Sequence, residues 1–156
     1  MNSVKQIISE HPFFRGMKPE HLDIIAGGAT EVTFKPDQIL LREGEPANRF
    51  YLIESGRVAL EAHEPANGTV LVESIGPGDV VGWSWLFPPF VWHFTARAVE
   101  PTRAVVLDGA HLLVTAERNR EFGYDLMKRV GQMVIHRLQS TRKKLLALQI
   151  ESALEG

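Results

Sequence analysis

Apolar residues follow a helical period at both ends of the chain and an alternating period between them. Residues 2–9 predict one short helix, and residues 18–28 predict a second that begins at Lys18-Pro19 and ends at Gly27-Gly28. Proline is well tolerated in the first turn of a helix because its missing N–H has no partner there, and glycine favours helix ends. We therefore expect residues 1–29 to form a pair of N-terminal helices.

Residues 30–108 alternate polar and apolar side chains, as half-buried strands do. In Glu31-Val32-Thr33-Phe34, for example, only every second residue is apolar. Turns rich in glycine and proline separate the alternating runs. The predicted strands cover residues 31–35, 39–41, 50–53, 58–62, 69–75, 80–86, 94–99 and 103–107. Short strands at regular spacing with such turns indicate a barrel or a sandwich.

Residues 109–156 return to helical spacing, with a short helix expected over 110–116 and a long helix over 120–150. The long helix carries a stripe whose members are three or four residues apart: Leu126, Val130, Val134, Leu138, Thr141, Leu145 and Leu148. This spacing is close to the 3.5-residue repeat of a coiled coil. A small barrel cannot bury so long a stripe alone, so we expect a homodimer through the 120–150 helix. Arg129 and Arg137 are expected on its flanks, and the run Arg142-Lys143-Lys144 is expected to form a charged helix face.

These patterns predict a mainly β protein with flanking helices and one domain over residues 1–156. Its parts would be the N-terminal helices at 1–29, a β-roll at 30–108, and a hinge with a long C-terminal helix at 109–156. The chain has no repeat or linker, and its length is ordinary for one domain. We expect residue 109 to mark the hinge between the β-roll and the helix.

Composition narrows the chemistry. Of the 156 residues, 44% are hydrophobic and 23% are charged, the net charge is −2, and there is no cysteine. The lack of cysteine excludes disulfides, thiolate zinc sites and iron–sulfur clusters. The small negative charge gives no general footprint for nucleic acid. No segment has the length of apolar residues that a membrane span needs, and the N-terminus lacks the layout of a signal peptide. We therefore expect a cytoplasmic protein without a membrane partner.

Three segments in a fixed order resemble cyclic nucleotide-binding domains of the bacterial cyclic-AMP receptor and fumarate-nitrate regulator superfamily. Residues 43–58, EGEPANRFYLIESGRV, are similar to the first β-roll signature of that family. Residues 76–82, GPGDVVG, resemble the run that leads into its phosphate-binding cassette. Residues 132–141 resemble its dimer helix. The resemblance implies a double-stranded β-helix, that is, a jelly-roll-like β-roll, with a dimerisation helix.

The cassette departs from the family at the two residues that hold the ligand. The resemblance implies a glutamate after Gly82 for the ribose hydroxyl and an arginine about ten residues later for the cyclic phosphate. Here Trp83 follows Gly82, and the arginine position falls on Trp92 or on His93, depending on where the count is anchored. A hydrogen bond to a charged group contributes about 1.5–3 kcal/mol. Loss of the arginine therefore weakens the binding of a cyclic phosphate roughly a hundredfold or more. Cyclic AMP or cyclic GMP remains a possible ligand, but not in the usual mode.

Aromatic residues replace the lost polar anchors. Six of them fall within twelve positions: Trp83, Trp85, Phe87, Phe90, Trp92 and Phe94. One interpretation is a pocket for a flat or apolar ligand, and the other is a barrel filled by its own rings. A third is an exposed patch for a protein partner. The candidate ligand-binding residues are Gly82, Trp83, Ser84, Trp85, Trp92, His93 and Thr141.

Other chemistry has little support in the sequence. Six histidines show no metal-ligand spacing, so we expect them to be ordinary, partly exposed side chains, and we expect no metal site and no haem. No catalytic motif is present, so we expect no enzyme activity. Arg97 could be a displaced phosphate partner. The residues after the long helix leave no room for a recognition helix, so direct DNA binding is not expected. The sequence therefore favours a non-catalytic ligand sensor, with a ligand-free interaction module as the alternative.

Overall fold

The structure is a computed structural model that describes residues 3–83 and 89–155. Its elements, in chain order, are α1 (Val4–Glu10), α2 (Pro19–Ala26), β1 (Ala29–Phe34), β2 (Ile39–Leu41), β3 (Arg49–Ser55), β4 (Val58–Glu64), β5 (Gly68–Ile75), β6 (Val80–Val81), β7 (Thr95–Ala98), β8 (Thr102–Asp108), α3 (Gly109–Arg118) and α4 (Arg120–Glu155). The described strands form two four-stranded antiparallel sheets, in the orders β1-β8-β3-β6 and β2-β7-β4-β5.

The core lies between the two sheets, where alternate side chains of each strand meet. In β7, Ala96 and Ala98 are buried, whereas Thr95 and Arg97 point to the opposite side and are only partly buried. In β3 the consecutive residues 50–53 are all buried, so both faces of this strand are covered. The predicted mainly β, jelly-roll-like fold with flanking helices is confirmed.

The tight turn between β3 and β4 depends on one glycine. Gly56 has a φ of +95°, and a Cβ at this position would lie 2.5 Å from the carbonyl oxygen of Pro101. A side chain here would therefore collide with the backbone that leads into β8. Only glycine meets both conditions, which explains why the turn between these strands contains glycine.

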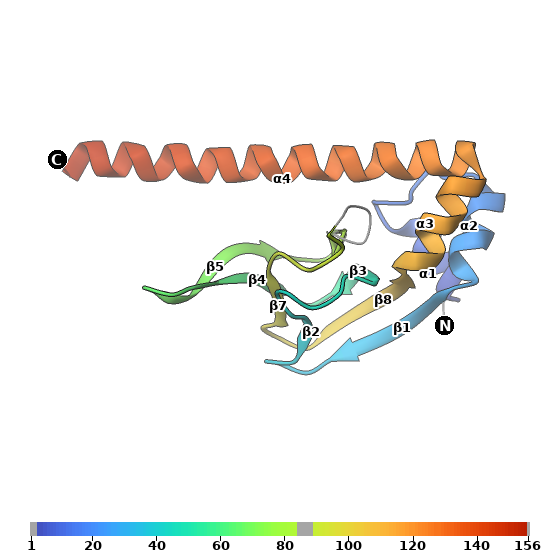
Figure 1. Cartoon of the computed structure of the whole chain (residues 1–156), viewed down its shortest axis with the longest axis horizontal. Coiled ribbons are helices and arrows are strands. Elements are labelled where there is room, and N and C mark those ends of the chain that lie inside the picture. The colour runs from blue at the N-terminus through green and yellow to red at the C-terminus, as the bar shows by residue number, and fades with distance from the viewer. Residues whose placement is uncertain (1–2, 84–88, 156) are drawn as a thin grey trace.

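The helices gather on one side of the β-roll (Figure 1). α1, α2 and α3 lie together at one end, and α4 runs along the whole molecule so that its C-terminal part extends above the β4–β5 hairpin. Asp108 begins α3 because its carboxylate accepts hydrogen bonds from the backbone N–H groups of Ala110 and His111. No helix in the described part of the chain carries the apolar run that crossing a bilayer requires.

The apolar stripe of α4 divides into two parts, which corrects the sequence interpretation. Leu126 and Val130 are buried in the chain's own core, together with Phe122 and Met133. The later part of the stripe is exposed, with 66% of Leu138 accessible to solvent. The first half of the helix is thus covered by the chain's own fold, including α3 at Ala116 and α2 at His21, whereas the second half is largely exposed.

Two arginines on the flanks of the apolar stripe of this helix point inward. Arg129 donates hydrogen bonds to the carbonyl oxygens of Phe13 and Arg15, at 2.7 and 3.1 Å. Arg137 donates to the carbonyl oxygen of Val80. Only 16% of each of these two side chains is exposed. The long apolar stem of each arginine lies across a packed surface, and its guanidinium donates to backbone oxygens.

Candidate ligand-binding site

Gly82 directly follows β6, the edge strand of the β1-β8-β3-β6 sheet. The two residues before it form β6, which pairs with Tyr51 and Leu52 of β3. Gly82 has a φ of +93°, and a Cβ there would lie 2.9 Å from the Arg49 carbonyl oxygen and 3.1 Å from the Trp92 ring. The strand predicted over residues 80–86 therefore ends at Val81 among the described residues, because the chain must turn at a left-handed glycine.

Trp92 belongs to the interior of the β-roll. Only 4% of it is exposed, and its ring lies against Gly82. Its backbone is held at both ends by the loop before β3: its N–H donates to Glu45 at 3.0 Å, and its carbonyl accepts from Gly44 at 2.8 Å. The glycine and the tryptophan at the two sides of the cassette are thus brought into contact.

The other described cassette residues differ in their surroundings. Trp83 and Phe94 are half-buried and pack against the core. His93 is exposed, and Phe90 is exposed with a φ of +56°, a strained conformation for a bulky side chain. Two candidates from the sequence, Ser84 and Trp85, lie outside the described residues.

Two further candidates do not join this cluster. Thr141 is exposed on the distal part of α4. Arg97, the possible displaced phosphate partner, donates to both oxygens of Glu61 at 2.9 and 3.2 Å and to Asp37 at 2.8 Å. These bonds raise the pKa of the Arg97 guanidinium, with the Glu61 hydrogen bond as the largest cause. Because Arg97 is fully engaged on the outer side of its sheet, it is a structural residue.

Arg137 of α4 reaches the run of residues that leads into the cassette. Besides its bond to the Val80 carbonyl, it lies 3.8 Å from an Asp79 carboxylate oxygen. Burial lowers the pKa of the Arg137 guanidinium, and Asp79 and Glu73 oppose this effect. Its Nε is buried without a hydrogen-bond partner among the described residues. A buried, incompletely paired cation therefore lies where α4 meets the β-roll.

The histidines also differ from the expectation of partial exposure. His11 and His21 are buried, at 6% and 3% exposure. The Nε2 of His11 lies 3.2 Å from the Ile53 carbonyl oxygen, and its Nδ1 accepts the backbone N–H of Phe13. The described residues contain no group of three or more histidine or acidic side chains that could hold a metal ion. Both buried histidines therefore pack the N-terminal segment onto the rest of the molecule.

A β-roll with a turn-and-cassette segment at one sheet edge and a long C-terminal helix defines a class of regulatory domain. The family model of the cyclic nucleotide-binding domain matches residues 31–119. This range is more than half of the chain, and the chain belongs to the cyclic nucleotide-binding domain family. The resemblance noted in the sequence is confirmed.

Curated relatives place this domain in larger proteins. The chain is 41% identical over 89 residues to acetyltransferase Pat of Mycolicibacterium smegmatis. The matched segment covers 57% of this chain and 26% of Pat. It is 28% identical over 103 residues to the CRP-like cAMP-activated global transcriptional regulator of Mycobacterium tuberculosis, covering 66% and 46% respectively. The chain therefore spans less than half the length of these two relatives.

A solved structure matches the chain over nearly all of its own length. A Geobacter metallireducens protein, described as a cyclic nucleotide-binding protein, is 30% identical with a TM-score of 0.78. The match covers 88% of this chain and 99% of that chain. The two chains therefore share most of their architecture.

Sequence reasoning missed that Arg129 joins α4 to the N-terminal segment and that Arg137 joins it to β6. The available signal was their spacing of eight residues, which places them near the same side of a helix as Leu126 and Met133. That signal needed the barrel as a partner before it could be interpreted.

Proposed function

We propose that this chain is a non-catalytic regulatory module that senses a small molecule other than cyclic AMP, or binds a cyclic nucleotide in a different mode. The carrying observation is the buried Trp92 in contact with Gly82. An indole in this position offers neither the charge nor the acceptor that a nucleotide phosphate and ribose would need. The family's frame is retained while its two polar anchors are replaced.

A chain of backbone contacts supports the sensor interpretation. The loop of residues 43–48 holds Trp92 through Gly44 and Glu45, and the carbonyl of Asn48 in the same loop accepts the N–H of Gly109 at 3.0 Å. Gly109 begins α3. A Cβ at Gly123 of α4 would lie 2.5 Å from the carbonyl oxygen of Ala116 in α3, so the two helices are closely packed. A change at Trp92 could therefore reach α4 through contiguous, packed elements.

The second part of the proposal is a homodimer through α4. The exposed apolar residues of its distal half include Leu138, Leu145 and Leu148. Together with Met127 and Val134 they form a stripe along one side of the helix. This side differs from the buried side that carries Leu126. Gly131 on this side has open space around it, which allows a close approach of a second helix. A second copy would cover this stripe with matching residues.

Calorimetry and tryptophan fluorescence test the proposed ligand mode. Cyclic AMP and cyclic GMP are the first probes, since one relative is described as activated by cyclic AMP. We expect binding at least about a hundredfold weaker than in a variant that restores both anchors, Trp83→Glu with His93→Arg. Exposed His93 accepts an arginine without burying a charge. Tight binding of cyclic AMP to the natural chain would contradict the proposal.

The arginine position can be assigned by a matched variant. Trp83→Glu with Trp92→Arg places the same two side chains in the chain but puts the charge at a buried site. An isolated buried charge destabilises the fold by several kcal/mol, of order 3–5. If this variant folds and binds cyclic AMP better than the His93→Arg variant, Trp92 occupies the arginine position.

The alternative is a ligand-free interaction module whose barrel is filled by its own tryptophans. The deep burial of Trp92 favours it, and the exposed, strained Phe90 would then be a contact for a protein partner. Acrylamide quenching separates the two functions. A ligand that changes the quenching of Trp83 and Trp92 supports the sensor, whereas unchanged quenching across haem, cyclic nucleotides and lipophilic metabolites supports the interaction module.

A further inference from the structure

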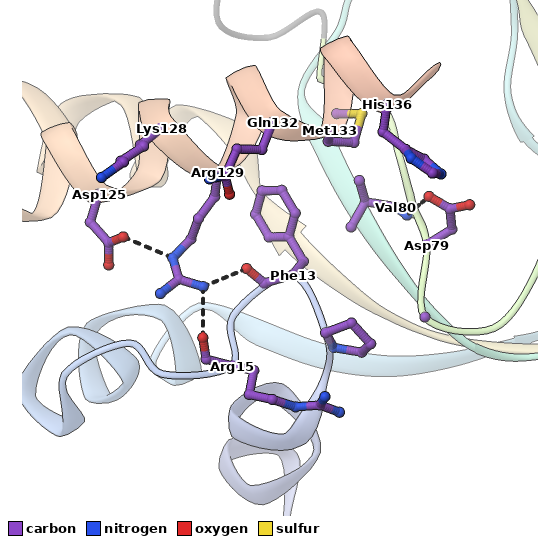
Figure 2. A pocket seen from close by; sticks show the side chains of 12 residues that line it. Phe13, Arg15, Asp79, Val80, Asp125, Lys128, Arg129, Gln132, Met133 and His136 are labelled. Atoms are coloured by element: carbon purple, nitrogen blue, oxygen red, sulfur yellow. Dashed lines mark hydrogen bonds and ion pairs between the residues drawn. The ribbon is translucent and has the colours of Figure 1, made fainter. Parts of the chain in front are cut away.

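A cavity of about 520 Å³ lies between the N-terminal segment, the turn before β6 and the first half of α4 (Figure 2). Its lining comes from three stretches of the chain, within residues 12–15, 78–80 and 125–136. The volume falls in the range of about 300–1,000 Å³ that is typical of small-molecule pockets. No described residue of the cassette lines it, so the cavity is separate from the site at Gly82 and Trp92.

The charged groups around the cavity do not cancel. Asp125 is paired with Arg129, with an Nε–Oδ1 distance of 2.9 Å. Asp79 lies 3.8 Å from Arg137, whose side chain is not part of the lining. Arg15 and Lys128 also line the cavity, and neither lies within ion-pair distance of a carboxylate among the described residues. Arg15 donates to the Glu10 carbonyl oxygen at 3.3 Å, and the Lys128 Nζ lies 5.8 Å from the centroid of the Tyr124 ring. Since each cation has further N–H groups, both can still donate to an anionic ligand.

One wall of the cavity is held in place by Arg129. Figure 2 shows its guanidinium between α4 and the N-terminal segment, where it bonds Asp125 and the carbonyl oxygens of Phe13 and Arg15. Because one side chain joins both elements, the positions of Arg15 and of α4 are fixed relative to each other. The site is thus partly preorganised, which lowers the entropy lost on binding.

The remaining lining supplies hydrogen-bond partners and apolar contacts. Gln132 and His136 follow Lys128 at intervals of four residues along α4, so all three lie on one edge of the cavity. In Figure 2, Lys128 and His136 stand at opposite ends of the pocket. Phe13 and Met133 provide an apolar surface between them. A ligand that fits this lining has an acidic group and an apolar body.

The cavity stays accessible when two copies pair through α4. Successive residues of a helix are about 100° apart around its axis, so Gln132 lies on roughly the opposite side from Val134 and Leu145. A second copy seated on the exposed apolar stripe therefore leaves the edge formed by Lys128 and Gln132 open to solvent.

We infer that this cavity is a second ligand site, for a small organic anion whose acidic group pairs with one of the two cations at its ends, Arg15 or Lys128, and whose apolar body contacts Phe13 and Met133. Such a ligand touches the N-terminal segment, the turn before β6 and α4 together. It therefore favours the arrangement in which α4 is docked on the β-roll. The inference does not depend on what the cassette binds.

Titration of ¹⁵N-labelled protein with phenyl phosphate tests the site, with inorganic phosphate and benzyl alcohol as the two partial ligands. We expect saturable binding of phenyl phosphate, weaker binding of either partial ligand, and shifts of the backbone signals of Phe13, Val80 and Gln132. The melting temperature should rise with the concentration of phenyl phosphate.

A pair of matched double variants decides the result. Arg15→Gln with Lys128→Gln should weaken phenyl phosphate binding tenfold or more, whereas Arg142→Gln with Lys143→Gln removes the same charge from the exposed distal part of α4 and should leave it unchanged. Circular dichroism checks that both remain folded. The inference is overturned if phenyl phosphate does not saturate at millimolar concentration, if both variants lose binding equally, or if only signals near Trp83 and Trp92 move. A cyclic nucleotide titration of the same sample reports on the cassette independently.

Discussion

The two halves of α4 have a similar sequence spacing but different surroundings. The proximal half is packed into the core through Phe122, Leu126 and Val130, and Arg129 bonds it to the N-terminal segment. The distal half touches the β4–β5 hairpin through an ion pair between Lys144 and Glu73 at 2.7 Å, and residues 141–150 are all exposed. One helix therefore combines an anchor to its own fold with a free surface, and only its surroundings distinguish the two roles.

The largest expected effect compares equal substitutions in the two halves. Leu126→Ala removes a fully buried side chain and should lower the free energy of unfolding by about 2–5 kcal/mol. Leu148→Ala removes a side chain that is 62% exposed and should change the monomer by about 0.5 kcal/mol or less. Urea unfolding at low protein concentration measures both. Equal losses would mean that the distal half is packed on its own β-roll.

The next effect concerns self-association. Leu138→Glu with Leu145→Glu places two charges on the exposed stripe and should weaken the dimer at least about a hundredfold, since each buried like charge costs more than 1.4 kcal/mol. Sedimentation velocity at micromolar concentration should then show the monomer mass.

The matched control adds the same charges elsewhere on the distal half. Gln139→Glu with Leu146→Glu lies on another side of the helix and should leave the mass of the dimer unchanged. A natural chain that sediments as a monomer would refute the dimer, and loss of the dimer in both variants would show that charge alone, and not the stripe, controls assembly.

A smaller effect is expected at the anchor. Arg129→Gln loses charge-assisted hydrogen bonds to Phe13, Arg15 and Asp125 and should lower the free energy of unfolding by about 2 kcal/mol. Arg142→Gln, on the exposed half, should change it by about 0.5 kcal/mol or less. Chemical denaturation of both variants gives the comparison, and an indistinguishable pair would show that Arg129 does not anchor the helix.

The smallest effect is on the pH dependence of stability near the anchor. Burial lowers the pKa of His11, with hydrogen bonds to Ile53 and Asp79 acting in the opposite direction. The folded state therefore keeps His11 neutral where the unfolded chain takes up a proton, so stability is fully present above the ordinary pKa of 6.5 and decreases as the pH falls below it. The urea concentration at the unfolding midpoint should be lower at pH 5.5 than at pH 7. The difference should be smaller in His11→Asn.

Because Glu54 also titrates in this range, the test compares the pH dependence of stability between variants. Burial and the neighbouring Glu31 raise the pKa of Glu54 to about 7, so its contribution to stability decreases as the pH rises between 4.5 and 7. This slope is opposite in sign and common to the natural chain and His11→Asn. His63→Asn, at an exposed histidine, is the control. An unchanged slope in His11→Asn would contradict the role of His11.

Local signals in the sequence were enough to predict most strands and helices. The hinge expected at residue 109 is where α3 begins, because Asp108 is a good capping residue and the alternating pattern ends there. The strand predicted over 80–86 was too long, since nothing in an alternating pattern reveals that Gly82 adopts a positive φ. Where the backbone turned for a non-local reason, the prediction failed.

The surroundings of individual side chains were harder to predict. The sequence placed tryptophans at the cassette but left open whether they line a pocket or fill the core, because burial depends on the loop at Gly44 and Glu45 that holds Trp92. The inward direction of Arg129 depends on carbonyl groups more than a hundred residues away. The cavity beside it combines three distant stretches, and no single window of sequence contains it.

The exposed half of α4 also has a mechanical consequence. Residues 137–155 of the helix extend about 28 Å at 1.5 Å per residue. A tilt of roughly 10° at the junction near Arg137 would move the far end by about 5 Å, which is close to one helical turn. The β-roll thus supports a lever whose free arm amplifies a small local displacement, and the stiffness of that arm comes from the unbroken hydrogen bonds of the helix itself.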